Sequence, residues 1–358
     1  MIVYFSFDEF RNTSLREVLQ AYEALMEKDI RKGTYVVLFD EIQKASGWED
    51  QLKGLYDTSG KTIKLVISGS GSLFIGKKSR ETLAGRLFEF KVDTLSFREF
   101  LSFKGVAVTP HKLYEKELLA LFSEFTLTLG FPELVNIKDK EIIRKYIHES
   151  IIEKIVYKDI PQLFAVKDSS VIESILRIFM EEPGQVIEIS QLAKELKVSR
   201  QTLSAYLTYL EHAFLLKKLY NFSRNARKTE RKLKKYYPAL ISTSLLFKDD
   251  DFSRSKVFEW LVVAQLKPDF FWRDAYKNEV DIVLTNGKPV PIEIKYGALD
   301  FKGMLVFMKK FGIAKGYIVS SRTEEVHTFG EKSISVTPAF TFLMERAGAI
   351  HEHGLKRR

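Results

Sequence analysis

The hydrophobic pattern of the first third of the chain predicts alternating strands and helices. Short apolar runs at Ile2–Phe5, Tyr35–Phe39 and Lys64–Ser68 have the length of buried strands. Apolar residues recur every three or four positions from Ser14 to Lys28, as on one face of a helix, and a second helix is expected near Trp48–Asp57. Mostly apolar strands separated by helices are typical of a parallel sheet, so the pattern predicts an α/β domain.

The rest of the chain has two further patterns. The stretch from Glu115 to Phe164 is helical with a break at Gly130–Pro132, and two short amphipathic helices with a turn between them follow from Ile187 to Leu210. A strand is expected at Ala213–Tyr220. The C-terminal third predicts a second α/β domain, with helices at Phe258–Leu266 and Phe301–Phe311 and strands at Phe270–Arg273, Glu279–Leu284, Val290–Lys295 and Gly316–Ser320.

Composition adds limits to this picture. The chain has 358 residues, enough for two or three domains, and it has no Cys, which excludes disulfides and cysteine metal sites. Because no apolar run has the length of a membrane span and no signal peptide opens the sequence, we expect a cytoplasmic protein without a membrane partner. Lys and Glu are frequent while Asn and Gln are sparse, which is typical of thermophile proteins.

The formal net charge of +9 favours a polyanionic partner. Much of the excess lies in the stretch from Arg224 to Lys235, RNARKTERKLKK. Such a run is typical either of a solvated helix face or of a surface that contacts phosphates.

An acidic pair follows the second predicted strand. Asp40 is placed to hold Mg²⁺ through water, and Glu41, one residue on, is placed to orient or deprotonate an attacking water molecule. The next strand is followed by Ser70, whose hydroxyl is placed between water and a γ-phosphate, and Arg86 is a candidate arginine finger. The alternative is an α/β domain with a merely acidic strand end.

The ordered motifs DEIQ, GWEDQLKGLYD, ISGSGS, ETLAGR and LSFREFL make the chain resemble the archaeal and bacterial AAA+-like ATPases that carry a C-terminal nuclease-like domain. The resemblance covers nearly the whole chain. It implies that Asp40 and Glu41 are the Walker B pair, that Ser70 is the sensor residue, and that Arg86 acts across a subunit boundary in a homo-oligomer. It also implies ATP with Mg²⁺ as the cofactor.

One part of that family's pattern is missing. No GxxxxGK[ST] loop precedes Asp40. The segment Gly71–Lys78, GSLFIGKK, contains a GxxxxGK match, but Lys78 stands where the loop needs Ser or Thr, and the match comes after the acidic pair. We therefore expect a domain truncated at its N-terminus, as a fragment, through a misassigned start, or as a natural form without the loop, and we expect that as it stands it does not hydrolyse ATP. A complete ATPase would need the loop from residues outside this sequence.

The two helices between Ile187 and Leu210 have the pattern of a helix-turn-helix, and with the following strand they predict a winged helix that binds DNA. The N-terminal residues of the second helix would reach base edges, and the basic stretch would contact phosphates. A lid or protein-interaction module is the alternative. The candidate DNA-binding residues are Arg200, Gln201, Ser204, Arg224, Arg227 and Lys228.

The strand with Glu293 and Lys295 places both side chains on one face, and the preceding strand brings Glu279 and Asp281. Together with Glu259 on the preceding helix, they resemble the PD-(D/E)xK nucleases of the restriction-endonuclease-like fold. The resemblance implies Mg²⁺ or Mn²⁺ on Asp281 and Glu293, Lys295 as the catalytic lysine and Glu259 as the helix carboxylate. A salt-bridged sheet face or an inactive docking module is the alternative.

These observations predict four segments: an AAA+-like core without its phosphate-binding loop (1–110), a helical lid (111–165), a winged helix (166–235) and a restriction-endonuclease-like α/β domain (236–358). The first hypothesis for function is an AAA+-like ATPase acting on or bound to DNA. The second is a Mg²⁺-dependent DNA nuclease. The third is a non-enzymatic, DNA-binding regulatory protein in which both sites are vestigial.

Overall fold

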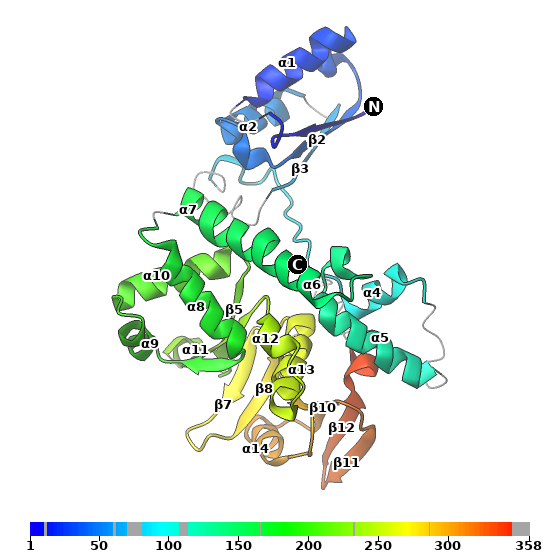
Figure 1. The fold of residues 1–358 in the computed structure, drawn as a ribbon, viewed down its shortest axis with the longest axis vertical. Coiled ribbons are helices and arrows are strands. Elements are labelled where there is room, and N and C mark those ends of the chain that lie inside the picture. The colour runs from blue at the N-terminus through cyan, green and yellow to red at the C-terminus, as the bar shows by residue number, and fades with distance from the viewer. Residues whose placement is uncertain are drawn as a thin grey trace. The chain divides into compact units, whose positions relative to one another are not determined.

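The computed structural model describes residues 1–10, 13–59, 62–69, 81–106, 114–164, 166–231, 233–285 and 287–345. The chain divides into two compact units (Figure 1). The first comprises Met1–Val92 and Lys158–Val166, and the second comprises Asp93–Tyr157 and Lys167–Arg358. Within the described residues, no helix combines the length and the apolar character that a membrane crossing requires.

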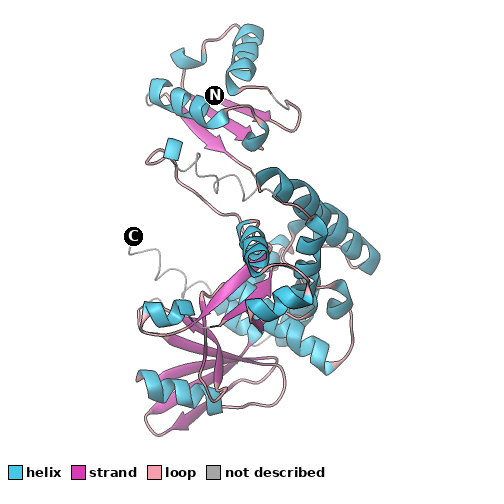
Figure 2. Cartoon of the chain, turned by 90° about the vertical axis from the view of Figure 1, so that its left-hand side faces the viewer, coloured by secondary structure: helices cyan, strands magenta, loops and turns pink. Residues whose placement is uncertain are grey.

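The first unit is built on a parallel sheet of order β1-β2-β3, which confirms the predicted α/β pattern (Figure 2). Its central strand is buried at alternate positions, with Val37 and Phe39 inside the core beside Leu15 and Trp48. Helix α1 begins at a capping box in which Ser14 and Glu17 bond each other's backbone N–H. The elements are β1 (Ile2–Ser6), α1 (Leu15–Met26), η1 (Ile30–Lys32), β2 (Tyr35–Asp40), η2 (Ile42–Lys44), α2 (Trp48–Ser59), β3 (Ile63–Ile67) and α7 (Ile160–Leu163).

The second unit begins with the predicted helical stretch. Its break falls at Gly130, whose φ of +79° and close approach to Thr94, 2.9 Å from the position of a Cβ atom, leave room for glycine alone. The elements are α4 (Phe97–Phe103), α5 (Glu115–Thr128), η5 (Pro132–Leu134), α6 (Lys140–Lys145) and the π-helical turns η6 (Tyr146–Glu153) and η7 (Ile155–Asp159), the last of which ends in the first unit.

The remainder of the second unit is a mixed sheet of nine strands in the order β11-β12-β10-β9-β8-β7-β5-β6-β4. The strands predicted at β5, β7, β8, β9 and β10 are confirmed, whereas β4, β6, β11 and β12 were not predicted. The strands are β4 (Gln185–Ile187), β5 (Leu216–Asn221), β6 (Lys234–Pro238), β7 (Phe270–Arg273), β8 (Glu279–Leu284), β9 (Val290–Lys295), β10 (Lys315–Ser320), β11 (Glu325–Phe329) and β12 (Lys332–Pro338).

Seven helices accompany this sheet in the described residues of the second unit after Lys167. They are α8 (Ser169–Glu181), α9 (Ile189–Glu195), α10 (Arg200–His212), α11 (Ala226–Arg231), α12 (Thr243–Leu246), α13 (Asp251–Leu266) and α14 (Lys302–Phe311). Helix α14 packs against β8, β9 and β10, where Phe307 and Phe311 lie in an aromatic core with Trp272.

Strand β5 joins the two halves of the nine-stranded sheet. It pairs antiparallel with β6 and parallel with β7, so the strands that follow the helix-turn-helix and those of the C-terminal α/β segment form one continuous sheet. Helix α13 packs on both β6 and β9. This arrangement brings β6 next to the candidate residues of α13 and β8.

Candidate functional site

The acidic pair of the first unit lies where the central strand ends. Asp40 is the last residue of β2, and its carboxylate accepts hydrogen bonds from Ser68, which follows β3, and from the Tyr4 hydroxyl on β1 at 2.8 Å. These two donors lower the pKa of Asp40, Ser68 more strongly than Tyr4, because they favour the charged form. Residues in or directly after all three strands therefore hold an ionised carboxylate at the C-terminal end of the central strand.

Glu41 leaves the strand in a left-handed conformation, with φ of 51° and ψ of 41°. Its carboxylate is 3.4 Å from the ammonium of Lys44, which also bonds Asp8. A non-glycine residue with positive φ stores backbone strain, and such residues cluster at functional sites. The conformation fixes Glu41 next to Asp40 while turning the chain sharply away from the strand.

Of the other two residues of the predicted ATPase site, the structure describes only Arg86. Ser70 and the segment Gly71–Lys78 lie outside the described residues. Arg86 pairs with Asp57 of α2, with Nε 2.8 Å from Oδ1 and a second nitrogen 3.3 Å from Oδ2. Arg86 is therefore held by a carboxylate of its own unit.

In the second unit, the structure brings the predicted nuclease-like residues together around a lysine that sequence reasoning missed. The ammonium of Lys235, on β6, lies 2.8 Å from Glu279, 3.2 Å from Glu259 and 3.3 Å from Asp281. Only 4% of Lys235 is exposed. A buried ammonium is expensive to desolvate, and three surrounding carboxylates offset that cost.

Glu293 and Lys295 lie on the same face of β9, as predicted, and form an ion pair of 2.9 Å. That pair uses Oε1 of Glu293, while Oε2 is buried and has no hydrogen-bond partner among the described residues. Asp281 is better satisfied, since its Oδ2 accepts from the Ile294 backbone N–H at 2.9 Å. The site thus contains one buried carboxylate oxygen that is aimed at no donor.

The electrostatics of this site reflect burial and mutual repulsion. Burial raises the pKa of Asp281 to about 6 despite the favourable charge of Lys235. Burial and then the Asp281 charge raise the pKa of Glu293 to about 8. For Lys295, burial is the largest influence and opposes the charged form, but the surrounding carboxylates, Glu293 first and then Asp281 and Asp300, together raise the pKa. The Asp281–Glu293 pair therefore retains a proton near neutral pH, chiefly on Glu293.

Oxygen donors of this kind fit a hard divalent cation, and the partnerless Oε2 of Glu293 beside Asp281 is the observation that favours one. Across the described part of the chain, however, no three His, Cys, Asp or Glu side chains are arranged to hold a metal ion together. The carboxylates of α13 and β8 turn instead toward Lys235.

Lys235 and Tyr237 are the site residues that the sequence did not reveal. Tyr237 donates a 2.6 Å hydrogen bond to Glu259 and is buried. The available signal was the sequence KKYYP, in which two aromatic residues that favour strands follow the basic run. The basic run places Lys235 either on a solvated helix face or on a surface that contacts phosphates, whereas β6 carries it into the interior.

Most of the candidate DNA-binding residues are exposed, and two of them, Ser204 and Arg224, are also engaged within the protein. Ser199 caps α10, and Arg200 and Gln201 in its first turn are exposed, while Ser204 is half-buried. Arg224 donates a 2.8 Å hydrogen bond to the Phe311 carbonyl and lies over the Phe311 ring, so it also anchors α14. Arg227 and Lys228 on α11 are exposed.

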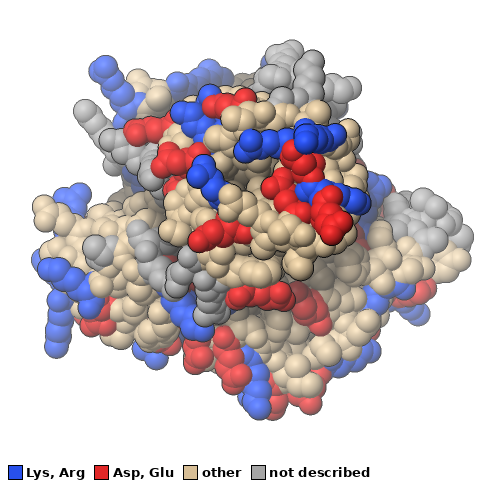
Figure 3. Space-filling view, turned by 90° about the horizontal axis from the view of Figure 1, so that it is seen from above, with Lys and Arg blue, Asp and Glu red and all other residues tan. Residues whose placement is uncertain are grey.

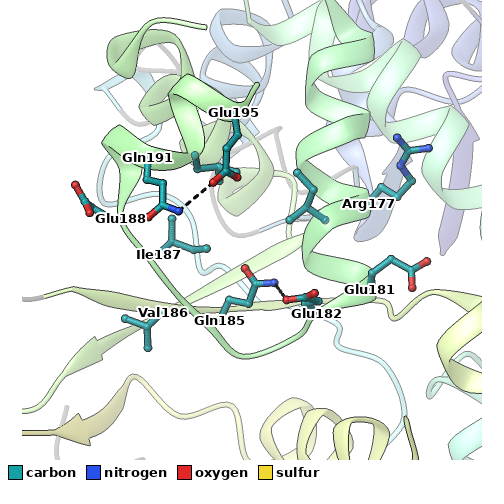
Figure 4. Close-up of a pocket in the computed structure, with 11 residues that line it drawn as sticks. Arg177, Glu181, Glu182, Gln185, Val186, Ile187, Glu188, Gln191 and Glu195 are labelled. Carbon is teal, nitrogen blue, oxygen red and sulfur yellow. Dashed lines mark hydrogen bonds between the residues drawn. The ribbon is translucent and has the colours of Figure 1, made fainter. Parts of the chain in front are cut away.

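A cavity beside α9 is lined mainly by acidic residues. The cavity has a volume of about 490 Å³ and lies between α8, β4 and α9 (Figure 4). Gln191 and Glu195 of α9 are joined by a hydrogen bond of 3.1 Å at its margin. Such a wall repels phosphate, which leaves the first turn of α10 as the better candidate for DNA. Its charged lining residues are Arg177, Glu181, Glu182, Glu188 and Glu195.

On the face of the molecule that Figure 3 shows, the basic residues do not form a continuous positive patch. In the view of Figure 3, basic and acidic side chains are interspersed among the described residues. The charge alone therefore does not locate a polyanion-binding surface there.

Comparison with family models matches three successive parts of the chain. Residues 1–101 match an AAA domain, which includes Asp40, Glu41 and Arg86. Residues 119–243 and 256–342 each match a domain of unknown function, DUF8612 and DUF4143 respectively. The first 101 residues are therefore similar to an AAA domain, and the other two matched parts are similar to domains whose function is unknown.

Comparison with curated proteins finds relatives that are themselves uncharacterized. Methanocaldococcus jannaschii proteins MJ1544 and MJ1637 are 27% and 26% identical over 82% and 89% of this chain, covering 68% and 74% of their own lengths. A Haemophilus influenzae protein is 30% identical over 61% of this chain and 54% of its own. The chain thus spans between about half and three quarters of these relatives.

Proposed function

We propose that this chain is the part of an AAA-like, DNA-associated ATPase that supplies the Walker B carboxylates. The observation that carries the proposal is the placement of Asp40 at the end of the central parallel strand, ionised and oriented by Ser68 and Tyr4. The chemistry of Mg²⁺ would be supplied when Mg²⁺-ATP is bound, with Asp40 holding the ion through water. Glu41 would orient the attacking water molecule.

The proposal requires a phosphate-binding loop beside Asp40, and no GxxxxGK[ST] motif stands before that residue in the sequence. Strand β3 pairs with β2 and with no other strand in the described residues, and Val66 on it is 40% exposed. Three alternate residues of the segment 88–92 are also exposed: Phe88 (89%), Phe90 (86%) and Val92 (95%). A strand edge without a partner in the described residues favours the addition of a further strand, which would bring a phosphate-binding loop to Asp40.

The test uses the protein in the form its own cell makes. Its intact mass and N-terminal peptide are measured first, and ATP hydrolysis is then compared between wild type, Asp40→Asn and Glu41→Gln. We expect the Glu41→Gln turnover to fall by about 10² or more while nucleotide binding is kept. Glu27→Gln is the matched control, because Glu27 has the same left-handed conformation and is exposed. Wild-type turnover in both acidic variants would refute the Walker B assignment.

We also propose that DNA binds through α10 and the exposed residues of α11, in a winged helix formed with β4, β5 and β6. Arg200→Ala is expected to weaken DNA binding by roughly ten-fold, and Arg227→Ala with Lys228→Ala to flatten its salt dependence. In a homo-oligomer, Arg86 would leave its ion pair with Asp57 and bind the phosphate of a nucleotide held by the neighbouring subunit. Binding that is independent of salt and of these residues would count against the DNA interface.

A second candidate function is metal-dependent cleavage of DNA by the C-terminal segment. The partnerless Glu293 oxygen beside Asp281, with Lys295 paired to the same carboxylate, favours it. Plasmid and branched DNA would be incubated with Mn²⁺ or Mg²⁺ and the wild type, Lys295→Ala or Asp281→Asn. Cleavage lost in both variants and kept in Lys288→Ala, an exposed lysine preceding β9, is the expected result. No cleavage of any substrate with either metal would end this candidate.

A further inference from the structure

Lys235 occupies the position that a bound cation would be expected to take among the carboxylates of α13 and β8. Its ammonium donates to Glu259, Glu279 and Asp281 at 3.2, 2.8 and 3.3 Å. Aromatic faces complete its surroundings, with the Tyr237 and Phe271 rings centred 5.6 and 6.0 Å away. Charge, hydrogen bonds and cation–π contacts therefore all hold the ammonium at this place.

The ammonium affects the two carboxylates that favour a divalent cation. Oδ1 of Asp281 accepts from Lys235 and Oδ2 accepts from the Ile294 N–H, so neither oxygen is without a donor. Oε2 of Glu293 alone has no donor in the described residues. A divalent cation shared by Asp281 and Glu293 would have to displace one of these donors and approach a buried positive charge, which repels it strongly at low dielectric.

We propose that Lys235 is a built-in counter-cation which competes with divalent metal at Asp281 and Glu293, so that metal binds tightly only when the ammonium is removed or withdrawn. This inference rests on the metal site of the second candidate function. Lys235 is a positioning residue here, since it acts through the carboxylates. Lys235 comes from β6, which pairs with β4 before helices α9 and α10 and with β5 after them, so the strand that carries the counter-cation belongs to the segment proposed to bind DNA.

The test measures Mn²⁺ binding by electron paramagnetic resonance and calorimetry on the whole chain at pH 7.5. Lys235→Met removes the charge while keeping an unbranched side chain, and we expect it to bind Mn²⁺ at least ten-fold more tightly than wild type. Lys235→Arg keeps the charge and should match wild type. Lys234→Met is the control for the same substitution on the neighbouring residue, whose ammonium lies over the Tyr220 ring.

Adding Asp281→Asn to Lys235→Met should abolish the gain, which would locate the ion. Equal Mn²⁺ affinity in wild type and Lys235→Met, or no binding by either, would overturn the proposal. If Lys235→Met does not fold in metal-free buffer, recovery of its far-ultraviolet circular dichroism with Mn²⁺ supports the proposal, and failure to recover with Mn²⁺ overturns it.

Metal binding and DNA cleavage are measured separately, so the counter-cation and the nuclease activity can fail independently. Tight Mn²⁺ binding by Lys235→Met without any DNA cleavage would end the nuclease candidate and keep the counter-cation. DNA cleavage by the wild type, together with unchanged metal affinity in Lys235→Met, would keep the nuclease candidate and overturn the counter-cation.

Discussion

The hydroxyl of Tyr237 donates a 2.6 Å hydrogen bond to Oε1 of Glu259. The two residues are 22 positions apart and connect the end of β6 to the middle of α13. Beside them, the indole N–H of Trp260 donates to the Pro238 carbonyl at 2.8 Å. These two bonds fix α13 over the strand that carries Lys235, so the position of the ammonium depends on this junction.

The first prediction concerns that hydrogen bond. Tyr237→Phe should lower the free energy of unfolding of the second unit by about 1–3 kcal/mol, since the Glu259 carboxylate loses a donor inside the protein. It should also raise the pKa of Glu259, which the Lys235 charge and the Tyr237 bond hold down against burial. Urea denaturation followed by tryptophan fluorescence checks the first effect. Tyr276→Phe, at an 88% exposed position, is the control, and equal stability of both variants would contradict the prediction.

The second prediction concerns the contact between α14 and β8. A Cβ atom added to Gly303 would lie 2.2 Å from the Glu279 carbonyl oxygen, which is backbone and has little freedom to move. Gly303→Ala should therefore destabilise the second unit by about 1–3 kcal/mol through overpacking and displace the strand end that carries Glu279. Gly297→Ala, with no atom within 4 Å of the new Cβ, should be close to neutral. Similar stabilities for the two alanine variants would show that this approach is not tight.

Strands with apolar interiors could be predicted from the sequence, and those whose burial depends on distant partners could not. The runs YVVLF and PIEI predict β2 and β9 because their own residues supply the buried surface. Strand β6 begins with Lys234 and Lys235, and nothing local shows that one of these lysines is buried. Its partners are 24, 44 and 46 residues away, so the sheet order that joins β6 to β5 had to be known first.

The candidate sites follow the same division. Asp40 and Glu41 could be located because a strand end fixes both backbone positions at once. That Arg86 pairs with Asp57 depends on how α2 packs beside the segment after residue 80, which local patterns do not specify. For Glu293 and Lys295, the two-residue period of a strand was enough to place both side chains on one face.

The third prediction concerns Asp40. Ser68→Ala removes the strongest of the contacts that lower the Asp40 pKa, so the pKa should rise toward its ordinary value. Tyr4→Phe should raise it less, because the Tyr4 bond contributes less. Carbon-13 NMR titration of the carboxyl groups measures both, with Ser46→Ala as the control. A larger rise in Tyr4→Phe than in Ser68→Ala would contradict the order of these two contacts.

The fourth prediction concerns pH and the Asp281–Glu293 pair. Their folded-state pKa values, about 6 and about 8, lie above the ordinary values of about 4 that they regain on unfolding. Between these limits the folded protein binds more protons than the unfolded one. The stability that the pair contributes is therefore complete below about pH 4 and is lost as the pH rises through about 6 to 8.

The expected loss is at most about 1.4 kcal/mol per pH unit for each proton. Urea denaturation is measured from pH 5 to pH 9 in a Trp48→Phe background, so that the buried Trp260 and Trp272 of the second unit give the signal. Glu293→Gln cannot ionise and should flatten the slope above pH 6, while Glu331→Gln, at an exposed position, should leave it unchanged. A wild-type stability that rises between pH 6 and pH 8, or a slope kept in Glu293→Gln, would show that Glu293 is already ionised in the folded protein.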